Sequence, residues 1–227
     1  MTTHENILRA LEGKSITKQN VFANTQENFK KLKERLKSCV EKLEKDFGNK
    51  DSRITFGYAD KGDFQAEIKV AGDILFFTMH TNAFQFDQSH SLWKSTYLKD
   101  HPENSYVGII NIYNFLADSF KYNRTADVGY LVGRIFINRE NHFLVQGKKN
   151  LGFRFNDFVN STLNDEVLCD IVEQAILHCL DFDLLAPPYE NVKQLSVEEI
   201  QSITESHALA TGKRLGFQFG LNEKSMQ

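Results

Sequence analysis

Cysteine and proline are both scarce in this sequence, which has three of each among 227 residues. Cys39, Cys169 and Cys179 are too few and too scattered to form a disulfide framework or a zinc knuckle. Cys169 and Cys179 fall on one predicted helix, where a rise of about 1.5 Å per residue separates them by roughly 15 Å, too far for a disulfide. We therefore expect buried, unreactive thiols, because free cysteine is among the most buried residue types.

The sequence also lacks a long hydrophobic run. Its longest apolar stretch, Tyr106 to Ala117, is interrupted by Asn111 and Asn114 and is shorter than the ~20 residues that cross a bilayer. The apolar part of Met1 to Lys14 carries three charged residues, so it does not form the hydrophobic core of a secretory signal. We expect no membrane span and a cytoplasmic location.

Neither sign of charge predominates, because 27 lysines and arginines stand against 30 aspartates and glutamates, a net charge of −3. This balance disfavours strongly basic nucleic-acid binders and acidic solvating tails. The hydrophobic fraction of 41% is ordinary for a globular chain. No repeat, low-complexity segment or linker divides the sequence, so we predict one domain over residues 1–227, in which residues 1–24 could form a loosely ordered arm.

Helical periodicity is clearest between residues 25 and 47. Apolar side chains recur there every three or four positions, with lysines and glutamates between them. Asn24 and Glu27 resemble a capping box at the start of this segment, and Gly48 follows its end. The pattern predicts a long amphipathic helix near the N-terminus.

The C-terminal part of the sequence predicts further helices. One begins at about Asp165 with Asn164 as its cap, and Pro187-Pro188 breaks the chain after it. A capping-box pattern then opens a short helix over residues 196–207, and residues 215–219 could form a last strand.

Between these helices the hydrophobic period changes to two. Residues 53–58, 64–70 and 74–80 are separated by turn-like segments, which predicts an antiparallel meander. Residues 130–137 and 142–146 flank a polar turn and predict a later hairpin.

The strands are grouped rather than alternating with helices, which argues against a doubly wound parallel sheet. Residues 106–120 are apolar and are predicted as a strand followed by a short helix. We predict an α+β fold, in which an antiparallel β-sheet, made of the meander and the later hairpin, is packed by a long N-terminal helix and C-terminal helices.

Four potential metal ligands, His80, Asp87, His90 and His101, lie close together in the sequence. Two imidazoles and a carboxylate can form an open triad that leaves positions for water, and a bound metal lowers the pKa of that water. Their spacing matches no specific ligand pattern, so the same residues could be ordinary surface groups. A divalent metal is the one cofactor that these residues suggest, and no motif requires it.

A weaker candidate site lies on the middle strand of the meander. Asp63, or Asp60 in its place, together with Glu67 and Lys69 could hold a metal ion and polarise a water molecule, as in a metal-dependent nuclease. Glu67 and Lys69 also fall on the solvent face of an ordinary alternating strand. Because no extended basic surface is evident, we do not expect nucleic acid as a partner.

The sequence contains no nucleotide-binding loop and no nucleophile turn, so no motif names a reaction. The first hypothesis is a non-catalytic module that binds a small ligand or a protein partner. The alternative is a metal-dependent hydrolase or nuclease that uses one of the two clusters. We also expect a homodimer or a complex with another protein, for which Trp93, Tyr97 and the segment Phe153-Arg154-Phe155 supply aromatic contacts.

Overall fold

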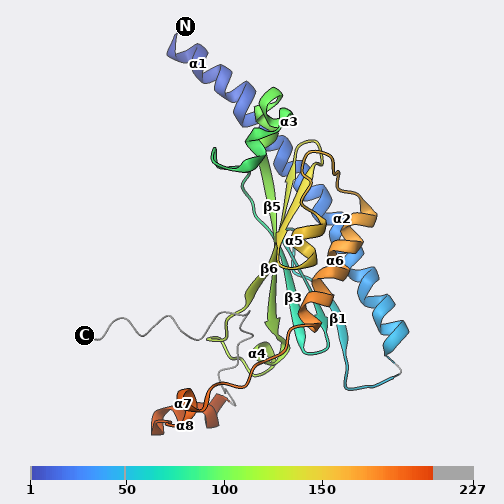
Figure 1. Ribbon diagram of the computed structural model, residues 1–227, viewed down its shortest axis with the longest axis vertical. Helices are drawn as coiled ribbons and strands as arrows, with labels where there is room; N and C mark the ends of the chain where they lie inside the picture. The colour runs from blue at the N-terminus through green and yellow to red at the C-terminus, as the bar shows by residue number, and fades with distance from the viewer. Residues whose placement is uncertain (1, 49, 207–227) are drawn as a thin grey trace, which may run out of the picture.

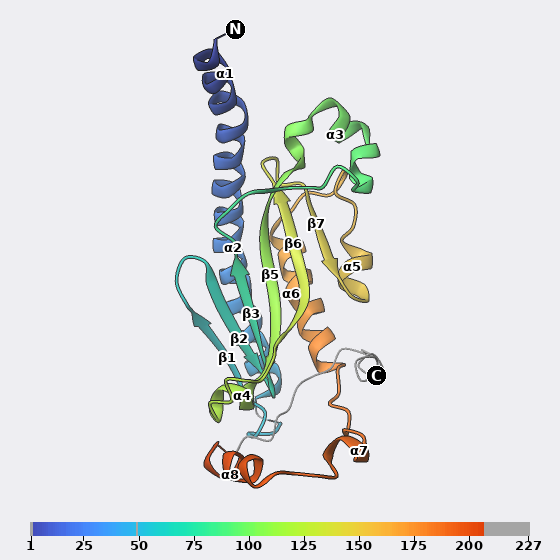
Figure 2. The same cartoon turned by 90° about the vertical axis from the view of Figure 1, so that its left-hand side faces the viewer.

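One antiparallel sheet and two long helices on the same face of it make up the fold (Figure 1, Figure 2). The computed structural model describes residues 2–48 and 50–206. The sheet has seven strands in the order β1-β2-β3-β5-β6-β7, with the short β4 paired to β5. The strands are β1 (Phe56–Asp60), β2 (Gln65–Val70), β3 (Asp73–Met79), β4 (Phe84–Gln85), β5 (Tyr106–Leu116), β6 (Tyr130–Asn138) and β7 (Phe143–Gly147). The predicted α+β class is confirmed.

The meander and the later hairpin form as the sequence predicts. β1, β2 and β3 pair in chain order, and β6 and β7 pair across a turn in which Asn141 adopts a φ of 63°. Asparagine tolerates this left-handed conformation better than most residues. β5 joins the two units, because it pairs with β3 on one side and with β6 on the other. The predicted short helix after it is α4 (Ala117–Lys121).

Helices α2 (Ile16–Phe47) and α6 (Asp165–Leu180) cover the first face of the sheet. Their apolar stripes pack on the inward side chains of the strands, and Leu32 and Leu36 of α2 are fully buried. The predicted cap of α6 is confirmed, because the side chain of Asn164 accepts a hydrogen bond from the backbone N–H three residues later. Although α2 has 32 residues, no helix of the described part of the chain is long and apolar enough to span a membrane.

The cysteines are free thiols, and two of them belong to this core. Cys39 and Cys179 are buried, whereas Cys169 is half-buried. Burial raises the pKa of the Cys39 thiol to about 11. The expectation of buried thiols is thus confirmed for two of the three.

The start of α2 differs from the prediction. Asn24 does not cap the helix but lies well inside it, and its side-chain amide donates a hydrogen bond of 2.6 Å to the carbonyl oxygen of Asn138. Glu27 pairs instead with Lys31, one turn further on. The predicted capping box is therefore wrong, because the residue that resembles a cap is used in a tertiary hydrogen bond.

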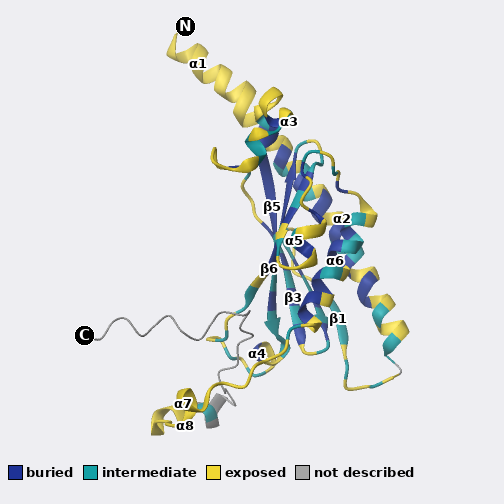
Figure 3. Cartoon of the chain, in the orientation of Figure 1, coloured by how far each residue is buried: buried dark blue, intermediate teal, exposed yellow. Residues whose placement is uncertain are grey.

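Helical turns continue beyond α2 toward the N-terminus. α1 (Thr3–Ala10) and a π-helical segment, η1 (Leu11–Ser15), extend the same rod past the end of the sheet (Figure 1). No residue of α1 or η1 is buried, as Figure 3 shows. Residues 1–24, which the sequence suggested as a loosely ordered arm, are thus helical from Thr3. Their side chains are buried only from Thr17 onward.

The second face of the sheet carries no long helix (Figure 2). Over one end of it lie the short helices η2 (Ser91–Lys94), α3 (Thr96–Asp100) and η3 (Pro102–Ser105). They close a separate, smaller core, whose buried members are Phe86, Leu98, Val107, Ile109, Phe136 and Phe158. Near the other end the rings of Phe76, Phe115 and Phe120 pack together, with centroids 5.3 to 5.6 Å apart. Between the two aromatic groups, side chains such as Thr78, Asn111 and Arg134 are half-buried, and no long helix of the described chain covers them (Figure 2).

The remaining helices lie at the periphery. α5 (Asn150–Arg154) packs beside β7, and α7 (Tyr189–Val192) and α8 (Val197–Ser206) lie away from the sheet in both views (Figure 1, Figure 2). The predicted capping box of α8 is confirmed by reciprocal hydrogen bonds between Ser196 and Glu199. The strand suggested for residues 215–219 lies outside the described residues.

Candidate functional site

A row of five polar side chains crosses the second face of the sheet. They occupy directly paired positions on adjacent strands, namely Gln65 on β2, Thr78 on β3, Asn111 on β5, Arg134 on β6 and Gln146 on β7. The residues that alternate with them point into the core beneath α2 and α6, so this polar row faces away from the long helices. Arg134 is its one charged member.

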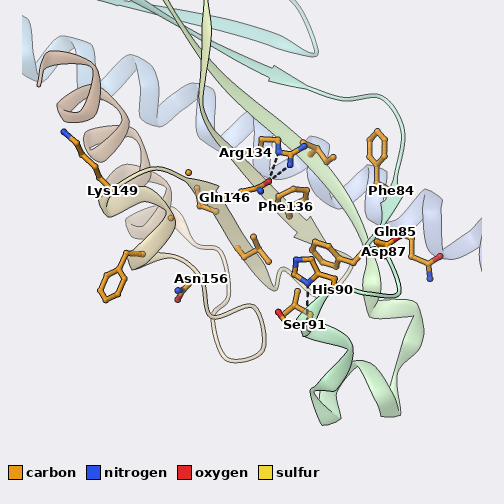
Figure 4. Close-up of a pocket in the computed structure, with 18 residues that line it drawn as sticks. Phe84, Gln85, Asp87, His90, Ser91, Arg134, Phe136, Gln146, Lys149 and Asn156 are labelled. Atoms are coloured by element: carbon orange, nitrogen blue, oxygen red, sulfur yellow. Dashed lines mark hydrogen bonds between the residues drawn. The ribbon is translucent and has the colours of Figure 1, made fainter. Parts of the chain in front are cut away.

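The polar row ends in a groove of about 850 Å³ (Figure 4). Phe136 and Leu144 form part of its floor, residues 84–92 make one wall, and α5 with Phe153 makes the other. The ring of Phe153 is 83% exposed. Apolar and polar side chains both line the groove, and its volume is within the range of ligand sites.

Arg134 supplies the positive charge on the floor of this groove. Its guanidinium lies 5.2 Å from the centre of the Phe136 ring, and its Nε donates a hydrogen bond of 3.0 Å to Oε1 of Gln146. Nη2 donates to the same oxygen. Within the described part of the chain no carboxylate forms an ion pair with Arg134, so its charge is available to an anion. A planar guanidinium beside apolar walls suits a carboxylate, phosphate or sulfonate group.

Other polar groups stand at the rim. Asp87 accepts hydrogen bonds from the backbone N–H and the hydroxyl of Ser89, which lower the pKa of its carboxyl group. His90 caps η2, because its Nδ1 accepts a hydrogen bond from the backbone N–H of Leu92. Lys149, at the start of α5, adds a second positive charge to the rim, although Figure 4 shows its side chain pointing away from Arg134.

Two of the four predicted metal ligands therefore reach this groove, Asp87 and His90. His80 lies outside it, with its ring 4.7 Å from that of Phe84, and Nδ1 of His101 lies 3.7 Å from Glu103. In residues 2–48 and 50–206 no three His, Cys, Asp or Glu side chains come together as a metal site requires. The metal-dependent alternative stays a prediction.

The second predicted cluster is spread along β2. Glu67 and Lys69 lie on the second face of the sheet as expected, and Asp63 lies in the turn before the strand. Glu67 forms a salt bridge of 3.2 Å with Lys61. Asp60, the substitute for Asp63, pairs with Lys33 of α2 at 2.7 Å. Both carboxylates thus have lysine partners within the fold.

A polar network that no sequence motif predicts lies at the C-terminal end of β6. The buried side chain of Asn138 donates to the hydroxyl of Tyr97 and accepts from the backbone N–H groups of Glu140 and His142. Tyr97 donates in turn to the Glu140 carboxylate at 2.7 Å, and Asn104 donates to it at 3.0 Å. This network fastens the β6–β7 turn to the segment that covers the smaller core.

The network changes the acidity of its members. Burial and the hydrogen bond to Glu140 raise the pKa of the Tyr97 hydroxyl. Burial alone would raise the pKa of Glu140, but the hydrogen bonds from Tyr97 and Asn104 and the charge of Arg139 together lower it. The carboxylate of Glu140 is therefore held in its ionised form.

The aromatic residues proposed as interface contacts have different surroundings. The indole of Trp93 donates a hydrogen bond to the carbonyl of Phe86, and Tyr97 packs on the same smaller core. Phe155 is buried in the main core, and Arg154 pairs with Asp170. Phe153 is the largely exposed ring of this set. It stands on the wall of the groove.

Comparison with family models, curated proteins and solved structures finds no match to this chain.

Proposed function

We propose that this protein is a non-catalytic binding module that takes an apolar segment with an acidic group in the groove beside Arg134. The proposal rests on Arg134, whose guanidinium lies over the ring of Phe136 and forms no ion pair with a carboxylate of the described residues. It lies on the face of the sheet that no long helix covers (Figure 2). Apolar walls supply burial of the ligand body, and the arginine orients the acidic group.

The surroundings of Arg134 favour binding over chemistry. Gln146 holds the guanidinium in place, and the ring of Phe136 lies under it. Such preorganisation lowers the ordering cost of binding. The free thiols of Cys39, Cys169 and Cys179 are consistent with a reducing compartment, so the proposal includes a cytoplasmic setting.

A fluorescence titration with 8-anilinonaphthalene-1-sulfonate tests this proposal. The probe combines an aromatic body with one negative charge, and its emission increases when it enters an apolar site. We expect saturable binding that Arg134→Gln weakens about tenfold, because the ion pair in the groove is lost. Phe153→Ser should also weaken binding, and this substitution removes a side chain that is mostly exposed, so the fold should be retained.

Arg53→Gln is the matched control. Arg53 is an exposed arginine paired with Asp51 outside the groove, and its substitution should leave the titration curve unchanged. The proposal is wrong if the probe does not bind the wild-type protein, or if its affinity is the same in Arg134→Gln, Phe153→Ser and wild type.

A further inference from the structure

The segment that follows α6 exposes an unusual amount of apolar surface. Every residue from 184 to 200 is exposed, including Leu185 (72%), Tyr189 (76%) and Val197 (74%). Soluble chains rarely leave so many large apolar side chains together in water unless they contact another surface. The large exposed apolar residues of the segment are Leu184, Leu185, Tyr189, Val192, Leu195, Val197 and Ile200.

The first part of this segment is extended and stiff. Residues 182–188 have no helix or strand, and Pro188 adopts φ −55° and ψ 140°, close to the polyproline II conformation. Pro187-Pro188 limits the number of conformations that the chain loses on binding. Extended proline-containing segments characteristically dock in grooves lined by aromatic rings.

The charge of the segment is acidic. Residues 181–200 contain five carboxylates and one lysine, and Asp183 and Glu190 flank the apolar and proline residues between them. Glu190 pairs with that lysine, Lys193, one turn further on, so Asp183 is the carboxylate next to the leucines that has no lysine beside it in the segment. The groove on the second face of the sheet carries two positive side chains, Arg134 and Lys149, against one carboxylate, Asp87. The rings of Phe84, Phe136 and Phe153 also line it. Apolar walls thus meet apolar side chains, and the charges are complementary.

We propose that residues 183–190 of a second copy of this chain occupy the groove beside Arg134. This inference rests on the proposed function of the groove and names its occupant. Leu184 and Leu185 pack against the aromatic walls, while Asp183 and Glu190 lie near the positive charges. Reciprocal exchange gives a closed two-fold dimer with two identical contacts.

The position of the segment favours a second copy over the same chain. After α6 the chain runs with α7 and α8 away from its own sheet, past the end marked by α4, whereas the groove lies between β6, β7, α5 and residues 84–92 (Figure 2). The segment is therefore presented outward while the groove of its own chain stays open.

Sedimentation velocity of the full chain over a range of concentrations tests the dimer. The wild-type mass should rise from 26.1 kDa toward twice that value. Leu185→Glu in the segment and Arg134→Glu in the groove should each hold the mass at the monomer value at every concentration. Ile7→Glu is the matched control, because Ile7 is an exposed apolar residue of α1 (52%) and its substitution should leave the dimer intact.

Mixing the two variants shows whether the contact lies between chains. The Arg134→Glu chain keeps an intact segment and the Leu185→Glu chain keeps an intact groove, so an equimolar mixture should form a heterodimer through one contact although each variant alone is monomeric. The double variant Asp183→Lys, Glu190→Lys should be monomeric alone and should dimerise when it is mixed with Arg134→Glu. Circular dichroism of each variant identifies any loss of fold. If Arg134→Glu does not fold, Phe153→Ser takes its place as the groove variant.

A wild-type chain that stays at 26.1 kDa at all concentrations overturns the inference, and so does a dimer that neither Leu185→Glu nor Arg134→Glu weakens. A monomer in which Leu185→Glu strengthens binding of the sulfonate probe also overturns it, because the segment would then occupy the groove of its own chain. If the probe binds in an Arg134-dependent way to a chain that never dimerises, the proposed function stands and this inference fails.

Discussion

Arg134 is the residue on which the proposed site depends, and nothing in its local sequence marks it. It is one polar position in an alternating strand, and its partners Asn111 and Gln146 are brought to it by strand pairing alone. Sequence reasoning did find two groups at the rim, Asp87 and His90, because a cluster of histidines is visible without knowledge of the pairing. The metal site predicted for them stays a prediction, and the structure adds that Phe136 and Leu144 lie in the same groove.

Leu36 gives a direct test of the main core. Its side chain is fully buried between α2 and the sheet, so Leu36→Ala should lower the free energy of unfolding by about 2–5 kcal/mol. Denaturant melts followed by circular dichroism measure this change. Leu177→Ala, on the exposed side of α6 (47%), is the matched control and should change stability by about 0.5 kcal/mol or less. Equal effects at the two positions would contradict the assigned packing.

Glu140 predicts a pH dependence of stability. Its pKa is lowered in the folded state, so the ionised carboxylate stabilises the fold above its ordinary pKa of about 4.3. That contribution disappears as the pH falls through the lowered folded value. Glu140→Gln should therefore reduce the melting temperature at pH 7, and the difference from wild type should shrink toward pH 3. A difference that stays constant over this range would show that the charge of Glu140 does not contribute.

At the scale of elements, helix α2 approaches strand β5 closely at one point. A Cβ atom on Gly108 would lie 2.0 Å from the hydroxyl oxygen of Thr25 and 2.7 Å from its Cβ. Glycine is required there so that the helix can lie against the sheet. Gly108→Ala should destabilise the protein by about 1–3 kcal/mol, measured by the same denaturant melts.

A double-mutant cycle identifies the cause of that loss. Thr25→Ala removes the hydroxyl and methyl groups of Thr25, which would lie 2.0 and 2.8 Å from a Cβ atom on Gly108. Gly108→Ala should therefore lower the free energy of unfolding by less in the Thr25→Ala background than in wild type. Gly57→Ala is the control in β1, where the nearest atom to an added Cβ lies at 3.8 Å, an ordinary contact distance. If the two substitutions prove additive, the contact between α2 and β5 does not limit the residue at position 108.

The elements themselves could largely be predicted from the sequence. A period of two located the meander and the hairpin, and a period near 3.6 located α2 and α6, because each element must bury one apolar face. The start of α2 was missed because Asn24 resembles a cap. The join between β3 and β5 could not be predicted, since 26 residues separate Met79 from Tyr106 and a shift by one residue would turn every side chain to the other face. The polar row depends on that register.

At the scale of the whole molecule, the two faces of the sheet have different roles. Helices α2 and α6 close one face with the main core, while the other face keeps an open strip between two aromatic groups. A second apolar surface lies between α2 and α6, where Cys39, Leu43 and Leu180 line a smaller hollow of about 200 Å³. Two carboxylates, Asp46 and Glu173, and one lysine, Lys42, line this hollow, so its charge favours an anion less than that of the groove beside Arg134.

Chemical-shift mapping with 8-anilinonaphthalene-1-sulfonate on isotope-labelled protein shows which face of the sheet binds an apolar anion. We expect the backbone amide shifts to concentrate in residues 84–92, in Arg134–Phe136 of β6, in Leu144–Gly147 of β7 and in α5. The amides of α2 and α6 should stay unchanged. Shifts concentrated around Leu43 and Leu180, or no saturable shifts at all, would contradict a binding groove on the second face of the sheet.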